Sequence, residues 1–277
     1  MIDRSDLMDQ TAQSRGAGDG AGSLELADVT KSFGGIRAIQ NVTLSVPPAA
    51  ITCLVGPNGA GKTTLFNLIT GVARPDEGSI TYRGAELTSL RTEQIVRLGV
   101  ARSFQSVRLF STLTALENIA VGISHQAGQT LAGSLLWIRW YRANRVKAGP
   151  RANEILERVG LSHRASVFAD ELPLAEQKLL GVGRLLATDA QMLLLDEPLA
   201  GLDDASITTV LSVLQELAAE GNGILLIEHN FDVVRALSDR AVFLSEGEVI
   251  FVGSPEEITT QEKLSRLYFG ESKGSHG

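Results

Sequence analysis

A glycine-rich stretch decides the fold: Gly56-Pro57-Asn58-Gly59-Ala60-Gly61-Lys62-Thr63-Thr64. It fits the pattern G-x-x-x-x-G-K-[ST] and lies between a short apolar run, 51–55, and a segment with helical spacing, 63–71. Glycines let backbone N–H groups curl around a phosphate, and the start of the following helix directs its positive end at the same anion. The stretch therefore predicts a phosphate-binding loop between a buried strand and a helix. In such a loop Lys62 reaches the β- and γ-phosphates of a nucleotide, and the Thr63 hydroxyl is a ligand for Mg²⁺.

A second motif is the apolar run 192–195, which ends in Asp196 and Glu197. Carboxylates at the C-terminal end of a parallel strand face the ligand crevice of an α/β sheet. We interpret Asp196 as a residue that holds Mg²⁺ through water, and Glu197 as the residue that orients and polarises an attacking water. The alternative is a strand that ends in two solvent-exposed acids. The phosphate-binding loop in the same chain favours the first interpretation.

The composition is that of a globular protein. Among 277 residues, 44% are hydrophobic and 21% are charged. The net charge of −7 argues against a protein that coats nucleic acid, and the lone Cys53 excludes a disulfide framework and a cysteine zinc site. No apolar run reaches the roughly 18–20 residues of a membrane span, and residues 1–23 lack the apolar core of a signal peptide. We expect a soluble, cytoplasmic chain with disordered tails at 1–23 and 271–277.

The remaining chain alternates between strand and helix patterns. Strands are predicted at 24–29, 42–46, 79–82 and 224–227, helices at 206–219 and 231–237, and a hairpin at 241–252 around Glu246-Gly247. Residues 114–162 are mainly helical in pattern. This alternation predicts an α/β core with a largely parallel sheet and a helical segment inserted between core strands.

With these motifs in order, the chain resembles the ATP-binding subunits of ABC transporters over roughly residues 24–270. Ser103-Phe104-Gln105 is similar to the glutamine loop of that family, and Ile227-Glu228-His229 to its switch histidine. Leu202-Asp203 matches its D-loop, and Phe33 stands where the family stacks an aromatic ring on adenine. A GTPase or a simple kinase has no reason to show these elements together.

The resemblance implies a P-loop NTPase with a RecA-like parallel-sheet core, an N-terminal antiparallel β region and an inserted helical subdomain. It implies one domain, 24–270, whose core is 24–104 and 190–270 and whose helical part is about 105–189. ATP and Mg²⁺ are the implied cofactors, with residues 56–64 and Phe33 on the nucleotide and Thr63, Gln105 and Asp196 on the metal. Gln105 offers a carbonyl oxygen to Mg²⁺ or to the attacking water, and His229 donates a hydrogen bond to the γ-phosphate. The alternatives are an ordinary surface histidine for His229 and a core aromatic for Phe33.

The signature sequence of the family, Leu-Ser-Gly-Gly-Gln, is altered in this chain. In the family it binds the γ-phosphate of the ATP that the other subunit of a dimer holds. The matching residues are Leu172-Pro173-Leu174-Ala175-Glu176. Pro173 removes a hydroxyl and an N–H group, and Ala175 replaces a glycine that lets the backbone approach a phosphate. We expect an asymmetric heterodimer, in which this chain's loop and Glu197 hydrolyse ATP against a partner's normal signature while the opposite site turns over slowly.

Several segments resemble the branched-chain amino-acid importer branch, namely 101–110, 112–118, 227–230 and 267–270. This resemblance implies uptake of branched-chain or related hydrophobic amino acids or amides, powered from the cytoplasmic face of the membrane. The implied partners are two permease subunits, a second ATPase chain or a second copy of this one, and indirectly a substrate-binding protein. The alternatives are a soluble ABC ATPase that acts as an assembly scaffold, and the ATPase of another system such as lipid or lipopolysaccharide export.

An insertion at 125–151 interleaves Trp137 and Trp140 with arginines that include Arg139 and Arg142. One interpretation is an amphipathic helix that covers the helical lobe. The other is a contact with the membrane surface or with the cytoplasmic loops of the permease.

Overall fold

The computed structural model of this protein describes residues 22–103, 109–124 and 145–260. Its described residues divide into two compact units, one formed by 22–92 and 223–260 and the other by those within 93–222. The first unit contains the phosphate-binding loop, and the second contains the acidic strand end.

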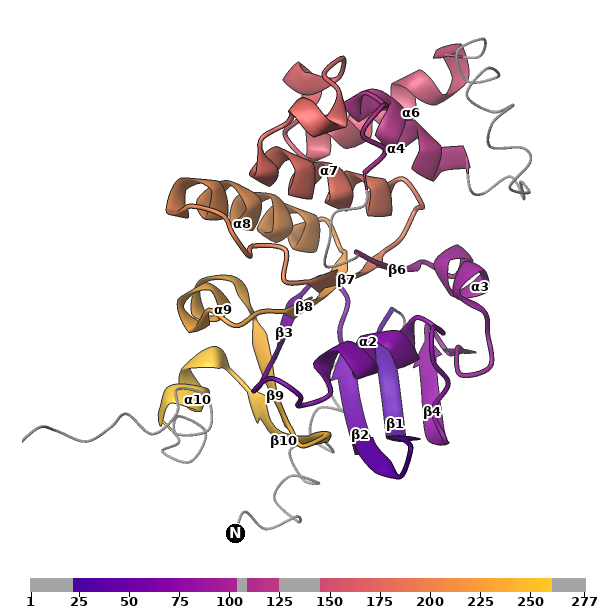
Figure 1. The fold of residues 1–277 in the computed structure, drawn as a ribbon, viewed down its shortest axis with the longest axis vertical. Coiled ribbons are helices and arrows are strands. Elements are labelled where there is room, and N and C mark those ends of the chain that lie inside the picture. Colours follow the sequence, from indigo (N-terminus) through magenta and orange to yellow (C-terminus); the bar gives the residue numbers. More distant parts are fainter. Residues whose placement is uncertain (1–21, 104–108, 125–144, 261–277) are drawn as a thin grey trace, which may run out of the picture. The chain divides into compact units, whose positions relative to one another are not determined.

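An antiparallel sheet occupies the N-terminal part of the first unit. Its order is β2 (Ile36–Val46), β1 (Leu24–Phe33), β4 (Glu77–Tyr82) and β5 (Ala85–Glu86), and the first three of these lie side by side in Figure 1. The alternation in β1 buries Leu24, Leu26 and Val29. Gly34 and Gly35, with φ of +56° and +86°, form the tight turn from β1 to β2. The predicted N-terminal antiparallel region is confirmed.

The parallel strands of the first unit centre on β3 (Ile51–Val55). This strand pairs in parallel with β8 (Gly223–Ile227) and with β9 (Arg240–Ser245), and β9 pairs antiparallel with β10 (Glu248–Gly253). Every residue of β3 and β8 is buried, as their continuous apolar runs indicate. Helices α2 (Lys62–Ile69) and α9 (Phe231–Leu237) follow β3 and β8 directly, and α10 (Pro255–Thr260) follows β10. The predicted strands, helices and C-terminal hairpin of this unit are confirmed.

The second unit combines a two-stranded parallel pair with a group of helices. The pair is β6 (Val100–Arg102) with β7 (Met192–Asp196). The helices are α3 (Thr92–Arg97, which begins on the last residue of the first unit), α4 (Ala115–Ser124), α6 (Arg145–Arg158), α7 (Leu174–Leu186) and α8 (Asp204–Ala219), with 3₁₀ turns η2 (Ser162–Arg164) and η3 (Ala169–Glu171). The helical character expected for 114–162 is confirmed over the described residues of that segment. The short elements α3 and β6 were not predicted.

Local hydrogen bonds fix the start of α4. Thr114 and Glu117 form a capping box, in which the Glu117 carboxylate accepts from the Thr114 N–H at 3.0 Å and the Glu117 N–H donates to the Thr114 hydroxyl at 3.3 Å. The buried Asn118 amide donates to the carbonyls of Phe110, Leu113 and Thr114, each within 3.1 Å. These bonds hold the loop before α4 against the helix.

Two glycines let α4 and α7 approach closely. A Cβ atom on Gly183 would lie 2.7 Å from Cδ1 of Ile119, and one on Gly122 would lie 2.6 Å from Cβ of Ala187. Both distances are shorter than ordinary van der Waals contact. A Cβ atom at Gly122 would clash with atoms that cannot move aside, whereas one at Gly183 would require the Ile119 side chain to shift.

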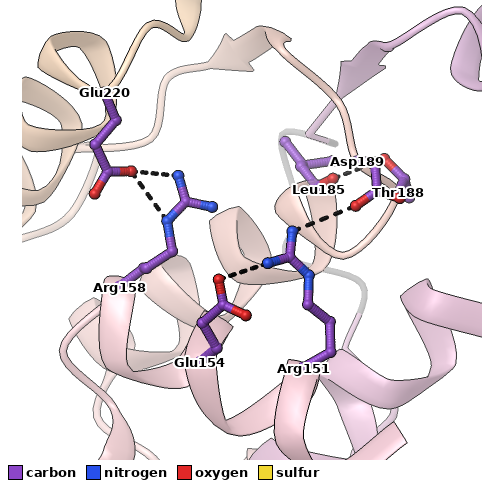
Figure 2. A network of polar contacts seen from close by, with 7 residues as sticks. All are labelled: Arg151, Glu154, Arg158, Leu185, Thr188, Asp189 and Glu220. Carbon is purple, nitrogen blue, oxygen red and sulfur yellow. Dashed lines mark hydrogen bonds and ion pairs between the residues drawn. The ribbon is translucent and has the colours of Figure 1, made fainter.

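Ion pairs tie α6 to its neighbours. Figure 2 shows the Arg151 guanidinium between Glu154, at 2.6 Å, and Asp189, at 3.4 Å. The Arg158 guanidinium is bonded to the carboxylate of Glu220, the residue that follows α8. The groups are largely exposed, so each pair adds at most about 1 kcal/mol to stability.

Among the described residues, no helix has the length and apolar character that a membrane span requires. The predictions for the tails fall almost wholly outside the described residues. So do Gln105, the segment 267–270, and both tryptophans of the 125–151 insertion.

Candidate functional site

The phosphate-binding loop depends on glycine at two positions where the backbone passes close to other segments. Gly56 has φ of +146°, and a Cβ atom there would lie 2.0 Å from the carbonyl oxygen of Leu244. Gly61 has φ of +104°, and a Cβ atom there would lie 2.5 Å from the carbonyl oxygen of Ala38. Side chains other than hydrogen are therefore excluded at both positions, as the motif requires.

The turn between β9 and β10 supports this loop through backbone hydrogen bonds. The Gly247 N–H donates to the carbonyl of Ala60 at 2.9 Å, and the Gly247 carbonyl accepts from the N–H of Gln40 at 2.8 Å. Gly247 has φ of +81°, and a Cβ atom there would lie 2.7 Å from the carbonyl oxygen of Ala38. The sequence pattern identified Glu246-Gly247 only as a hairpin turn and carried no signal of its contact with the loop.

Lys62 lies at the first position of α2, inside the loop. Its ammonium donates to the carbonyls of Gly56, at 2.7 Å, and Pro57, at 2.9 Å, and the residue is only 7% exposed. Gly61 is the N-cap of this helix and supplies no side-chain hydrogen bond. A buried cation and a helix N-terminus thus converge on one loop, and this combination suits a phosphate.

Phe33 lies at the end of β1, next to the turn into β2. It is 51% exposed, so the alternative of a core aromatic is wrong. The Lys31 ammonium lies 5.3 Å from the centre of its ring and is held there by an ion pair with Asp76, at 2.7 Å. An exposed ring face of this kind can stack on a base.

His229 follows β8 and is exposed, whereas the preceding Glu228 is buried. The His229 N–H donates to the Glu228 carboxylate at 3.3 Å. The next residue, Asn230, caps α9 by accepting from the N–H of Asp232 at 3.0 Å. The backbone at the strand end is thus held on both sides of an exposed imidazole, which is compatible with both interpretations of His229.

In the second unit, Asp196 ends β7 and is buried, with only 4% of its side chain exposed. Its carboxylate is paired with the guanidinium of Arg102, at 2.8 Å, and its N–H donates to the Ser103 hydroxyl at 3.2 Å. The alternative of a solvent-exposed acid is therefore wrong for Asp196. The sequence did not predict a role for the Arg102 side chain, because no local pattern shows that it contacts a carboxylate 94 residues away.

Glu197 is half-buried and has a left-handed backbone, with φ of +50°. This conformation costs a non-glycine residue about 1–2 kcal/mol and is often found at functional sites. The Lys178 ammonium stabilises the turn by donating to the carbonyls of Glu197, at 3.4 Å, and Ala200, at 2.5 Å. Lys178 comes from α7, so the signature helix and the turn that carries Glu197 are joined within this unit.

The signature residues surround the start of α7. Pro173 occupies the cap position without a side-chain hydrogen bond, and the helix begins at Leu174, which is 45% exposed. Glu176 lies in the first turn and pairs with the guanidinium of Arg164 at 2.9 Å. The first turn of α7 therefore already holds a carboxylate, paired with an arginine, at the position matched to the glutamine of the signature.

Leu202 and Asp203 precede α8. The Asp203 carboxylate caps this helix by accepting from the N–H of Ser206 at 2.8 Å. This hydrogen bond, with a second one from the Ser206 side chain, holds the pKa of Asp203 below its usual value. Asp203 thus has a structural role in this chain in addition to its match with the D-loop.

The oxygen donors present suit Mg²⁺, which prefers one or two protein oxygens together with phosphate oxygens and waters. Asp196 is a buried carboxylate already paired with a cation, and Thr63 supplies a hydroxyl at the second position of α2. Within the described ranges, no group of three or more His, Cys, Asp or Glu side chains could hold a metal.

A strand–loop–helix phosphate site, together with an acidic end on a second buried strand, defines a P-loop nucleotide-binding protein. Residues 39–200 match the family model described as ABC transporter, and the chain belongs to that family.

Two similar proteins carry the name of branched-chain amino acid transport ATP-binding proteins. The chain is 40% identical over 241 residues to the high-affinity branched-chain amino acid transport ATP-binding protein LivG of Salmonella typhimurium, covering 87% of this chain and 94% of LivG. It is 35% identical to the corresponding protein BraF of Pseudomonas aeruginosa, covering 90% and 98% of the two chains. Among solved structures, an ATP-binding cassette of an ABC transporter in its ADP conformation matches with a TM-score of 0.81 and 31% identity, covering 90% of this chain and 99% of that one.

Proposed function

We propose that this chain is the ATP-binding and ATP-hydrolysing subunit of an importer for branched-chain or related hydrophobic amino acids or amides. The observation that carries the proposal is the phosphate loop, whose backbone only glycine can adopt at Gly56 and Gly61 and which encloses the Lys62 ammonium. The transport names of LivG and BraF support the class of cargo.

In this proposal each site residue has a separate role in binding or hydrolysing the nucleotide. Lys62 and the N–H groups of residues 56–64 bind the β- and γ-phosphates, and Phe33 stacks on adenine. Thr63, Gln105 and Asp196 hold Mg²⁺, which neutralises charge on the phosphate oxygens. Glu197 orients the attacking water, and His229 donates to the γ-phosphate as negative charge develops.

The proposed assembly places the chain at the cytoplasmic face of the membrane, bound to two permease subunits and a second ATPase subunit or a second copy of itself. A substrate-binding protein acts on this assembly indirectly. We keep the proposal of a single ATPase domain, 24–270, in which residues 105–189 form the helical part. For the 125–151 insertion, the two interpretations stand as proposed.

The start of α7 supports the proposed asymmetry between two ATP sites. The Glu176 carboxylate in the first turn of α7 is already paired with the Arg164 guanidinium, and Pro173 supplies neither a hydroxyl nor an N–H group to a phosphate. A partner's ATP bound at this helix would therefore be held weakly. The site that uses this chain's own loop and Glu197 is the proposed hydrolytic one.

The test is ATP hydrolysis by the complex with its permeases, reconstituted in liposomes with the substrate-binding protein. Glu197→Gln should lower the rate by roughly 10²- to 10⁴-fold, as expected for loss of a group that activates water. Glu157→Gln, which removes an exposed acid on α6, should leave the rate unchanged. If the equivalent change in the partner ATPase lowers the rate as much as Glu197→Gln, the asymmetry is wrong.

Co-purification and transport measurements distinguish an importer ATPase from the assembly ATPase and the export ATPase. An importer ATPase co-purifies with two permeases, and its hydrolysis rises when a loaded binding protein is added. A chain that hydrolyses ATP without a permease would be the assembly ATPase, and one whose permease moves lipid outward would belong to an export system.

A further inference from the structure

The strongest feature outside the proposed roles is the ion pair of Arg102 and Asp196. The Arg102 Nη2 atom lies 2.8 Å from Oδ2 of Asp196, and the two side chains are only 13% and 4% exposed. Both residues end strands, since Arg102 closes β6 and Asp196 closes β7. The pair therefore lies at the carboxyl end of a parallel strand pair, where ligands bind in α/β sheets.

A buried carboxylate requires a positive partner. The loss of hydration of an isolated carboxylate far exceeds what ordinary packing recovers, so the ion is stable only beside a cation. The Arg102 guanidinium supplies that cation in this structure. The proposed function assigns the same carboxylate to Mg²⁺.

A guanidinium at hydrogen-bond distance and a divalent ion at the same carboxylate repel each other strongly at low dielectric. Mg²⁺ that binds at this carboxylate must therefore either displace the guanidinium or bind more weakly because of the repulsion between the two positive charges. We propose that the Arg102 guanidinium is the counter-ion of the Asp196 carboxylate in the nucleotide-free protein. It moves away from this carboxylate when Mg–ATP binds. Arg102 thereby raises the Mg²⁺ concentration at which nucleotide is bound. This inference rests on the proposed function, because it needs Asp196 to meet the metal.

The backbone around the pair allows this exchange without disruption of the strands. The Ser103 N–H donates to the carbonyl of Leu194 at 2.8 Å, and the Asp196 N–H donates to the Ser103 hydroxyl at 3.2 Å. These bonds do not involve the guanidinium. A rotamer change of the arginine side chain would therefore leave these bonds at the end of β7 intact.

The test is Mg²⁺ titration of nucleotide binding, measured with a fluorescent ATP analogue that is not hydrolysed, on the full-length chain. Arg102→Ala should lower the half-saturating Mg²⁺ concentration by on the order of ten-fold, because the competing charge is gone. Arg102→Lys keeps a charge at this position and should stay within about three-fold of the wild type. Arg158→Ala removes an arginine from an ion pair in the same unit (Figure 2) and should leave the concentration unchanged.

Thermal unfolding is the second measurement, and it distinguishes a counter-ion of Asp196 from a residue that only supports the fold. Without Mg²⁺, Arg102→Ala should lower the melting temperature by on the order of 5–10 °C, since the carboxylate loses its partner. In an Asp196→Asn background the effect of Arg102→Ala on the Mg²⁺ requirement should fall below about two-fold. Arg102→Gln, which removes the charge but keeps much of the length, replaces Arg102→Ala if that variant does not fold.

The outcomes distinguish the inference from the function. An unchanged or raised Mg²⁺ requirement in both uncharged variants overturns the counter-ion role, even if both are destabilised, while ATP binding by the wild type still stands. A wild-type chain with no Mg²⁺-dependent nucleotide binding would overturn the proposed function and the inference together.

Discussion

Substitution of Gly56 by alanine should damage the fold itself, and not only the affinity for phosphate. Its φ of +146° belongs to a region that is populated almost only by glycine, and a side chain there costs about 1–3 kcal/mol. The new Cβ would also lie 2.0 Å from the backbone oxygen of Leu244. This oxygen cannot shift easily, because Leu244 belongs to the paired strand β9. We expect a total loss of at least about 3 kcal/mol in the free energy of unfolding.

Gly59→Ala is the matched variant in the same loop. Gly59 also has a positive φ, +81°, but nothing lies within 4 Å of its added Cβ. Only backbone strain remains, so the expected loss is about 1–2 kcal/mol. Gly84→Ala, in the turn between β4 and β5, has a φ of +75° and the same open surroundings, so it reports this strain outside the loop.

The measurement is urea unfolding of the nucleotide-free chains, followed by circular dichroism. Equal losses for Gly56→Ala and Gly59→Ala would refute the reasoning, because the close approach to Leu244 would then have no energetic effect. A loss for Gly59→Ala far above that of Gly84→Ala would show that loop strain was underestimated.

Three further outcomes are expected. Asn118→Ala should lower the stability by about 3 kcal/mol in thermal or urea unfolding, because the Phe110 N–H loses its acceptor and the carbonyls of Phe110, Leu113 and Thr114 keep only their backbone donors beside the buried site. A loss below about 1 kcal/mol would contradict this. Burial raises the pKa of the Cys53 thiol to about 12, so a maleimide should label the native chain very slowly at pH 8 and the urea-unfolded chain at once. Asp203→Ala should lower the melting temperature at pH 7. Because the pKa of Asp203 is lowered in the folded chain, this stabilisation is present above the usual carboxyl pKa of about 4 and is lost as the pH falls through the lowered value. The difference from the wild type should therefore shrink in acid, and a difference that stays constant to pH 2 would refute it.

Elements set by local pattern could be predicted from the sequence. The run 51–55 and the glycines after it define a strand, loop and helix; the structure shows the strand at the same residues and the helix at Lys62–Ile69, against the predicted 63–71. The apolar run 224–227 similarly becomes β8, because a continuous run of this length fits only a strand buried on both faces. The short elements escaped prediction, since β6 has only three residues and no period can be read from it.

Contacts between distant residues could not be predicted. The motif around Asp196 indicated a metal ligand, but its pairing with Arg102 depends on β6 and β7 being neighbours. The Lys178 bonds to the turn at Glu197 depend in the same way on where α7 lies within its unit. Side chains of such length can reach many positions, and only the folded backbone selects one.

The bonds of Gly247 have a consequence for protein engineering. Its N–H and carbonyl connect Ala60 to Gln40 through main-chain atoms, so side-chain changes at those two positions, other than proline at Gln40, leave the bonding groups in place. Lengthening the β9–β10 turn would remove it, so an epitope tag or fluorophore-bearing peptide inserted at Glu246 should disable the chain. The turn at Gly84, whose surroundings are open, is the better place for such a label.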